Sequence, residues 1–137
     1  MRIFLDTNVL LDVLGRRQPH CVPAAEIWSR VEQGALEGHI SAISFNNVYY
    51  VLRRLESRKA AREGLRLLRA IFRIVPLTER IVQRAVDSEM SDFEDAIQFF
   101  SAHHACAAFI LTRNVHDFPS EPIAVMTPQE FVGMETV

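Results

Sequence analysis

Several acidic, amide and hydroxyl side chains stand directly after predicted strands or at the start of predicted helices. Asp6 follows the apolar run that opens the chain, and Asp92 begins a segment with a helical pattern. The other members of the set are Glu94, Asp95, Thr112, Asn114 and Asp117. Because open α/β sheets bind ligands beyond the carboxyl ends of their strands, we expect these groups to converge in one cleft.

Several carboxylates in one cleft favour a divalent cation. Neighbouring carboxylates repel each other, and their pKa values rise unless a cation neutralises them. Mg²⁺ and Mn²⁺ prefer oxygen ligands and keep several of their waters. A bound water could attack a phosphodiester while the metal stabilises the leaving oxygen. The chemistry that this set of residues favours is therefore metal-dependent hydrolysis.

Simpler structural roles are open to most of these residues. Asp95 is the exception, because the apolar residues Ala96 and Ile97 follow it on the side expected to be buried. Capping or solvated first-turn positions would suffice for Asp6, Asp92 and Glu94, and turn positions for Asn114 and Asp117.

The elements that must position these residues alternate along the chain. The apolar patterns and cap residues predict strands at 1–5, 39–42, 73–77, 107–112 and 123–126. They predict helices at 9–14, 23–33, 45–55 after a Ser44 cap, 59–72, 79–89, 92–104 and from 128 onward. Alternating strands and helices predict an α/β fold in three layers, with a central parallel sheet of about five strands and helices on both faces.

Length and composition agree with one domain that spans residues 1–137. The chain has 49% hydrophobic residues, which is typical of a globular protein. Its apolar runs, such as 105–111, are too short to span a bilayer, and residues 1–20 lack the features of a signal peptide. Cys21 and Cys106 belong to no CxxC pair, so we expect reduced thiols. We therefore expect a cytoplasmic protein without membrane contact.

The charge is unevenly distributed along the chain. The net charge of −2 argues against strong non-specific nucleic-acid binding by the whole surface. Arginines nevertheless gather between residues 53 and 73, and acids between residues 87 and 95. The arginines could hold phosphates near an acidic cleft, or they could form a solvated helix face with local salt bridges.

Four segments together resemble the PIN-domain family. The segment 4–10, FLDTNVL, resembles the opening of PIN domains, and 40–44, ISAIS, is similar to the segment that leads into a helix there. The segments 92–97, DFEDAI, and 111–114, LTRN, with 117–118 after it, look like the later acidic segments of the family. The matches follow the family's order and extend over nearly the whole chain.

This resemblance implies a fold and a function. PIN domains are parallel sheets wrapped by helices, and many are toxins of toxin–antitoxin pairs, of the VapC type. The resemblance implies a metal-dependent endoribonuclease that uses Mg²⁺ or Mn²⁺ to hydrolyse RNA phosphodiesters with a metal-activated water. It also implies a cognate antitoxin as inhibitor and, by analogy, a homodimer. The apolar residues of the helices between 44 and 72 are the expected dimer face, and the antitoxin is expected to lay a helix in a groove.

The resemblance assigns roles to the site residues. Asp6 and Asp95 are expected to bind the metal, with Thr7 or Asn8 supporting Asp6. The expected catalytic acids are Asp6, Asp95 and Asp117, the expected metal ligands are these three with Asn114, and the expected supporting residues are Thr7, Asn8, Asn47, Asp92, Glu94 and Thr112.

The sequence departs from the family pattern at two positions. The family usually has a glutamate six residues beyond the serine that matches Ser41, and this chain has Asn47 there. Asn114 likewise stands where a fourth acid is expected. An asparagine offers a neutral carbonyl oxygen but no charge. Asp117 could compensate at one end of the site, and Glu94 or Asp92 at the other.

These departures leave a second function open. A PIN-like module that binds RNA or a protein without cutting would need fewer charges than a nuclease. A phosphatase that uses an acid at the end of its first strand is disfavoured, because Asn8 stands where such enzymes need a second aspartate. The chain has no glycine-rich loop for a nucleotide.

Overall fold

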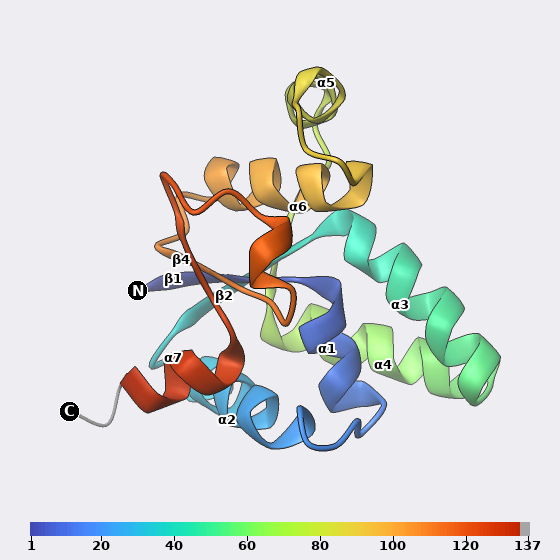
Figure 1. The fold of residues 1–137 in the computed structure, drawn as a ribbon. Helices are drawn as coiled ribbons and strands as arrows, with labels where there is room; N and C mark the ends of the chain where they lie inside the picture. Colours follow the sequence, from blue (N-terminus) through green and yellow to red (C-terminus); the bar gives the residue numbers. More distant parts are fainter. Residues whose placement is uncertain (135–137) are drawn as a thin grey trace.

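The computed structural model describes residues 1–134, and its centre is a parallel sheet (Figure 1). The described strands are β1 (Arg2–Leu5), β2 (Glu37–Ser41), β3 (Arg73–Val75), β4 (Phe109–Leu111) and β5 (Ala124–Met126). Their order in the sheet is β3-β2-β1-β4-β5. The chain therefore places β2 and β3 on one side of β1 and then returns to add β4 and β5 on the other side. The change of direction lies between β1 and β4, which is where sheets of this kind bind ligands.

The strands end together at one edge of the sheet. Leu5 of β1 pairs with Leu111 of β4, and each is the last residue of its strand. The ladder extends one residue further, because the Asp6 amide donates to the Leu111 carbonyl over 3.0 Å and the Thr112 amide donates to the Met126 carbonyl over 3.1 Å. The backbone at residues 6 and 112 is thus fixed by the sheet.

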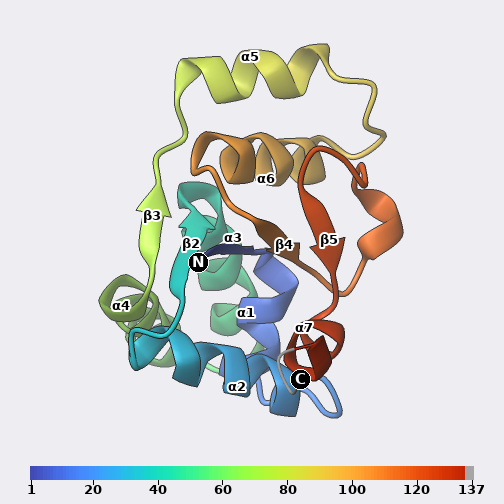
Figure 2. The same ribbon diagram turned by 90° about the vertical axis from the view of Figure 1, so that its left-hand side faces the viewer.

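Helices cover both faces of the sheet. They are α1 (Thr7–Leu14), α2 (Cys21–Glu32), α3 (Ala42–Leu55), α4 (Arg58–Ile71), α5 (Glu79–Asp87), α6 (Phe93–His104) and α7 (Pro128–Met134), with a 3₁₀ turn at Val115–Asp117. Figure 2 shows α5 and α6 on one side of the sheet and α1, α2, α4 and α7 on the other. This is the three-layer α/β arrangement that the sequence predicts.

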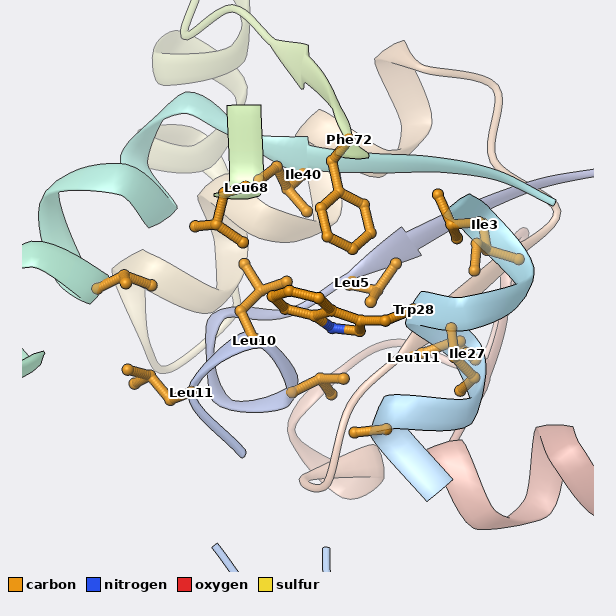
Figure 3. Packing of buried hydrophobic residues seen from close by; sticks show 14 of the residues in the cluster. Ile3, Leu5, Leu10, Leu11, Ile27, Trp28, Ile40, Leu68, Phe72 and Leu111 are labelled. Carbon is orange, nitrogen blue, oxygen red and sulfur yellow. The ribbon is translucent and has the colours of Figure 1, made fainter. Parts of the chain in front are cut away.

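The core has one cluster on each face because side chains alternate along the strands. Ile3 and Leu5 of β1 enter the cluster under α1 to α4, whereas Phe4 enters the cluster under α5 and α6. Trp28 meets Phe72 edge to face, with ring centroids 5.2 Å apart. Figure 3 shows Trp28 within the first cluster, with Phe72 and Leu10 around it. Burial of these side chains packs α1, α2 and the end of α4 against this face of the sheet.

The sequence predictions hold for each strand and helix, and one capping assignment is wrong. Strand β2 begins at Glu37 rather than residue 39, and α3 follows it without a loop. Ser41, and not Ser44, caps α3 by accepting a hydrogen bond from the Ile43 amide over 3.2 Å. Ser44 lies in the first turn of the helix and is fully buried. Within residues 1–134 no helix is both long and apolar enough to cross a membrane.

Candidate metal and phosphodiester site

Asp6 is held in place at the junction of β1 and α1. Its backbone is in the sheet ladder, and its Oδ1 accepts a hydrogen bond from the Thr7 amide over 2.8 Å, so it caps α1. Its Oδ2 accepts from the Thr112 hydroxyl over 2.8 Å and from Asn8 Nδ2 at 3.3 Å. The side chain has little freedom to turn away, because it is only 4% exposed. The capping role and the site role predicted for Asp6 are therefore compatible.

Residues after β4 complete this corner of the site. The Thr112 hydroxyl donates to Asp6 and accepts from the Asn114 amide over 3.1 Å. Asn8 Oδ1 lies 3.5 Å from the amide nitrogen of Arg113 and accepts its hydrogen. Thr112 itself is fully buried and does not line the cleft. It contacts the predicted site residues Asp6 and Asn114 through these hydrogen bonds, and the supporting role that the family resemblance implies stays a prediction.

The first turn of α6 supplies the second group of acids. Asp92 caps the helix by accepting a hydrogen bond from the Asp95 amide over 2.9 Å. Glu94 and Asp95 follow in the first turn, where the helix dipole favours negative charge. Asp117 comes from the 3₁₀ turn after β4. Each of these four acids borders the same hollow as Asp6.

The hollow is an open cleft of about 430 Å³ at the carboxyl edge of the sheet. Figure 1 shows α1, α3 and α6 beginning on this side of the molecule. All the predicted site residues except Thr112 line the cleft, namely Asp6, Thr7, Asn8, Asn47, Asp92, Glu94, Asp95, Asn114 and Asp117. Leu11, Arg17, Val51 and Arg113 complete the lining. The sequence prediction that these groups converge agrees with this geometry.

The pKa values of two carboxyl groups in the cleft are strongly raised. Burial raises the pKa of Asp6 to about 6, although the hydrogen bonds from Thr112 and Thr7 oppose the shift. Desolvation, and then repulsion by Asp6 and Asp92, raise the pKa of Asp95 to about 7. Asp117 and Glu94 raise the pKa of both carboxyl groups further. The ionised forms of these two carboxyl groups are therefore disfavoured in the metal-free cleft.

This donor set fits a hydrated divalent cation. Mg²⁺ and Mn²⁺ take carboxylate and amide oxygens and retain waters, and a cation would offset the desolvation and the repulsion that raise the two pKa values. Among residues 1–134, no three His, Cys, Asp or Glu side chains already stand in a metal-binding arrangement. The open cleft and its carboxylate and amide oxygens suit an ion that keeps several of its waters.

Asn47 borders the cleft from α3. Its Nδ2 atom is buried and has no hydrogen-bond partner among residues 1–134. The side chain brings an amide to the position where the family resemblance leads us to expect a carboxylate. The α3 residues that line the cleft, Asn47 and Val51, are uncharged, whereas Asp92, Glu94 and Asp95 at the start of α6 are acidic.

A buried polar network joins the three helices that begin at the cleft. The hydroxyl oxygens of Thr7 and Ser44 are 2.8 Å apart. Gln98 of α6 donates to Thr7 Oγ1 over 3.0 Å and to Ser44 Oγ over 3.2 Å. Ser44 and Gln98 are fully buried. The network fixes α1, α3 and α6 relative to each other, and neither Ser44 nor Gln98 was recognised from the sequence.

Three further charged residues were missed: Arg17 and Arg113 line the cleft, and Asp12 pairs with both of them. Asp12 of α1 is completely buried, and its two carboxylate oxygens pair with Arg17 at 3.0 Å and with Arg113 at 2.9 Å. The signal in the sequence was an acid inside the apolar run VLLDVL, one helical turn after Asn8. A carboxylate on an apolar face needs a partner. The arginine-rich helix α4, singled out by composition, does not line the cleft.

The chain is similar to known proteins over most of its length. The family model described as PIN domain matches residues 2–116 of the chain. Ribonuclease VapC1 of Aquifex aeolicus (strain VF5) is 26% identical over 135 residues, which cover 95% of this chain and 92% of that protein. The matched family region contains the sheet strands β1 to β4 and most of the residues that line the cleft.

Solved structures have the same fold. A chain of a toxin–antitoxin complex from Klebsiella pneumoniae matches with a TM-score of 0.69 and 25% identity, over 92% of this chain and 97% of that chain. A chain of VapBC2 from Rickettsia felis, bound to a DNA fragment from its promoter, matches with a TM-score of 0.74 and 12% identity, over 93% of this chain and 98% of that chain. The latter likeness concerns the fold alone.

Proposed function

The chain belongs to the PIN-domain family, and we propose that it is an endoribonuclease that acts as the toxin of a toxin–antitoxin pair. The similarity to a VapC ribonuclease and to the chain of a toxin–antitoxin complex supports this assignment. We further propose that residues 1–137 form one PIN-like domain and that the cleft described above is its active site.

One observation carries the proposal. Asp6 and Asp95, from separate parts of the chain, border one cleft with three further acids, and the pKa values of both are raised. A cluster of carboxyl groups whose ionisation is opposed by burial and by mutual repulsion is costly for a structure without a cation. Its placement at the switch point of a parallel sheet is where ligands bind in this class of fold.

The residues of the chain would share the work as follows. A bound Mg²⁺ or Mn²⁺ would supply an activated water and charge stabilisation at the phosphate. Asp6, Asp95 and Asp117 would hold the cation, with Asn114 offering a neutral oxygen. Thr112 keeps Asp6 oriented toward the cleft. The remaining lining residues, Thr7, Asn8, Asn47, Asp92 and Glu94, would shape the cleft and its water.

Cleavage of a labelled, structured RNA in Mn²⁺, Mg²⁺ or EDTA tests the proposal. We expect the wild type to cut in a divalent cation and not in EDTA. Asp95→Asn should lower the rate by at least about 100-fold. The matched control is Glu32→Gln, which removes a charge from an exposed position of α2 outside the cleft. Equal rates for wild type and Asp95→Asn would exclude this site.

A catalytically weakened binding module is the second candidate. Asn47 and Asn114 favour it, because both border the cleft at positions where a nuclease benefits from negative charge. Such a module would bind RNA equally well in EDTA and would cut none of it. The same RNA, tested for binding and for cleavage in parallel, separates the two candidates.

Two partners follow from the proposed toxin role. We propose a homodimer through α3 and α4, where Tyr50, Leu55 and Leu67 are exposed apolar side chains. Light scattering at micromolar concentration should give twice the mass of the chain. We also propose a cognate antitoxin, without which expression of the wild type, but not of Asp95→Asn, should arrest growth of the host.

A further inference from the structure

Arg17 and Arg113 stand at the border of the cleft and share one buried anchor. Arg17 Nε lies 3.0 Å from Asp12 Oδ1, and Arg113 Nε lies 2.9 Å from Asp12 Oδ2. The Asp12 side chain has no exposed surface, whereas the side chains of Arg17 and Arg113 are 38% and 30% exposed. One carboxylate thus holds two guanidinium groups that both reach solvent.

Asn8 links both arginines to the acidic centre. Arg17 donates from a terminal nitrogen to the Asn8 backbone carbonyl over 3.4 Å. Asn8 Oδ1 accepts from the Arg113 backbone amide, while Asn8 Nδ2 donates to Asp6. Asn8 and Asp12 lie one turn apart on α1 and therefore face the same way. The two arginines are consequently fixed relative to Asp6.

The contacts with Asp12 leave charge and hydrogen-bond donors of the two arginines available to a ligand. A single carboxylate balances one of the two positive charges, so the trio leaves one positive charge uncompensated. Both anchoring contacts use Nε. Among residues 1–134, no hydrogen bond occupies the terminal nitrogens of Arg113, which leaves the donors that bind phosphate oxygens in pairs.

Arg113 also borders three hollows of the surface. It lines the acidic cleft with Arg17, and it lines two neighbouring hollows of about 420 and 490 Å³. A polyanion in the cleft could extend past Arg113 over either of these hollows. Five carboxylates border the cleft itself, so a phosphate next to the reacting one would need cationic contacts at the border.

We propose that Arg17 and Arg113 form a phosphate-binding subsite that holds the RNA backbone beside the reacting phosphodiester. This inference rests on the proposed ribonuclease function. Asp12 is the positioning residue of the subsite, because it fixes both guanidinium groups and is itself out of reach of a ligand. The subsite selects for a backbone phosphate and not for a base, since its free donors match phosphate geometry.

Binding of a labelled single-stranded oligoribonucleotide, followed by fluorescence anisotropy in EDTA and in Ca²⁺, tests this subsite. Gels verify that the RNA stays intact. We expect Arg113→Ala to weaken binding about tenfold and to reduce the salt dependence of log affinity by about one unit. Arg113→Lys should retain most of the salt dependence but lose part of the affinity. Arg69→Ala, which removes the same charge from an exposed position of α4, should bind like the wild type.

The outcomes are distinct from those of the cleavage test. If Arg113→Ala binds RNA with the affinity and salt dependence of Arg69→Ala, or if the wild type binds no RNA, the subsite is excluded. A thermal unfolding curve for each variant shows whether Arg113 only stabilises Asp12, which would lower the Tm without changing the salt dependence. RNA that binds through Arg113 but is never cut in Mn²⁺ contradicts the proposed ribonuclease and supports the subsite.

Discussion

The hydroxyl of Thr112 donates a hydrogen bond of 2.8 Å to Oδ2 of Asp6, across 106 residues of sequence. It joins the ends of β4 and β1, the two strands between which the sheet changes direction. The bond lowers the pKa of Asp6 against the opposing effect of burial. Thr112 therefore helps to keep a buried carboxylate charged and turned toward the cleft.

Removal of this hydroxyl is the first test. Thr112→Val keeps the shape of the side chain but removes the shorter of the two hydrogen bonds to Asp6 Oδ2 and leaves the Asn114 amide without its acceptor. We expect a loss of about 1–2 kcal/mol in the free energy of unfolding and a fall of about 10- to 100-fold in metal affinity or activity. Thr112→Ser keeps the hydroxyl and should stay close to the wild type. Equal activity of the Val and Ser variants would exclude a role for the hydroxyl.

The raised pKa of Asp95 predicts how stability depends on pH without metal. Its pKa is about 7 in the folded protein and about 3.9 in an unfolded chain. Between these values the folded state binds more protons than the unfolded state, so stability falls as the pH rises. In EDTA, Asp95→Asn should therefore be more stable than the wild type near pH 8, by a margin that shrinks toward about pH 5.

Thermal unfolding of both proteins across this pH range measures the effect. Glu32→Gln, an exposed position of α2, is the control and should shift the Tm little at any pH. Saturating Mn²⁺ should raise the Tm of the wild type and reduce the advantage of the variant. A difference between wild type and Asp95→Asn that does not change with pH would show that the repulsion in the cleft is not its cause.

The buried network of Thr7, Ser44 and Gln98 should matter for stability. Ser44→Ala removes one hydroxyl and leaves the other two polar side chains short of a partner, which should cost about 1–3 kcal/mol in the free energy of unfolding. Ser29→Ala, in an exposed helical position, should stay within about 0.5 kcal/mol of the wild type. Chemical denaturation of both variants measures whether the network contributes this much to the free energy of unfolding.

Asn47 provides a test by gain of charge. Asn47→Glu places a carboxylate on the side of the cleft that has least negative charge. We expect Mn²⁺ affinity to rise about tenfold, because ligand charge tunes the affinity of such sites. The metal-free variant should unfold at a lower temperature than the wild type, since the new charge adds to the repulsion. Asn46→Glu, on the exposed neighbouring position, should leave Mn²⁺ affinity unchanged.

Local patterns in the sequence indicate the fold and most of the residues that line the cleft. The alternation of apolar runs with cap residues indicates each strand and helix, and residues that follow strands indicate Asp6, Thr112 and Asn114. The Ser44 capping assignment was wrong because a strand runs into α3 without a loop, which moves the cap to Ser41. A buried hydroxyl and a capping hydroxyl look alike in sequence.

Long-range pairing explains what the sequence alone could not provide. Gln98 of α6 binds Thr7 of α1 across 91 residues of sequence. Arg113, which follows β4, pairs with Asp12 of α1. No local pattern specifies such partners. Composition pointed instead to the arginines of α4, which lie on an exposed helix face, whereas the two arginines at the cleft lie outside that cluster and 96 residues apart in the sequence.

Mn²⁺ binding measured by isothermal titration calorimetry, with wild type beside Asp95→Asn and Glu32→Gln, tests the central claim most directly. The claim is that the carboxylates of the cleft hold the divalent cation on which RNA hydrolysis depends. We predict that the wild type and Glu32→Gln bind Mn²⁺ with the same affinity and that Asp95→Asn loses at least about tenfold. Equal Mn²⁺ affinity in all three proteins, or no binding by the wild type, would contradict the account.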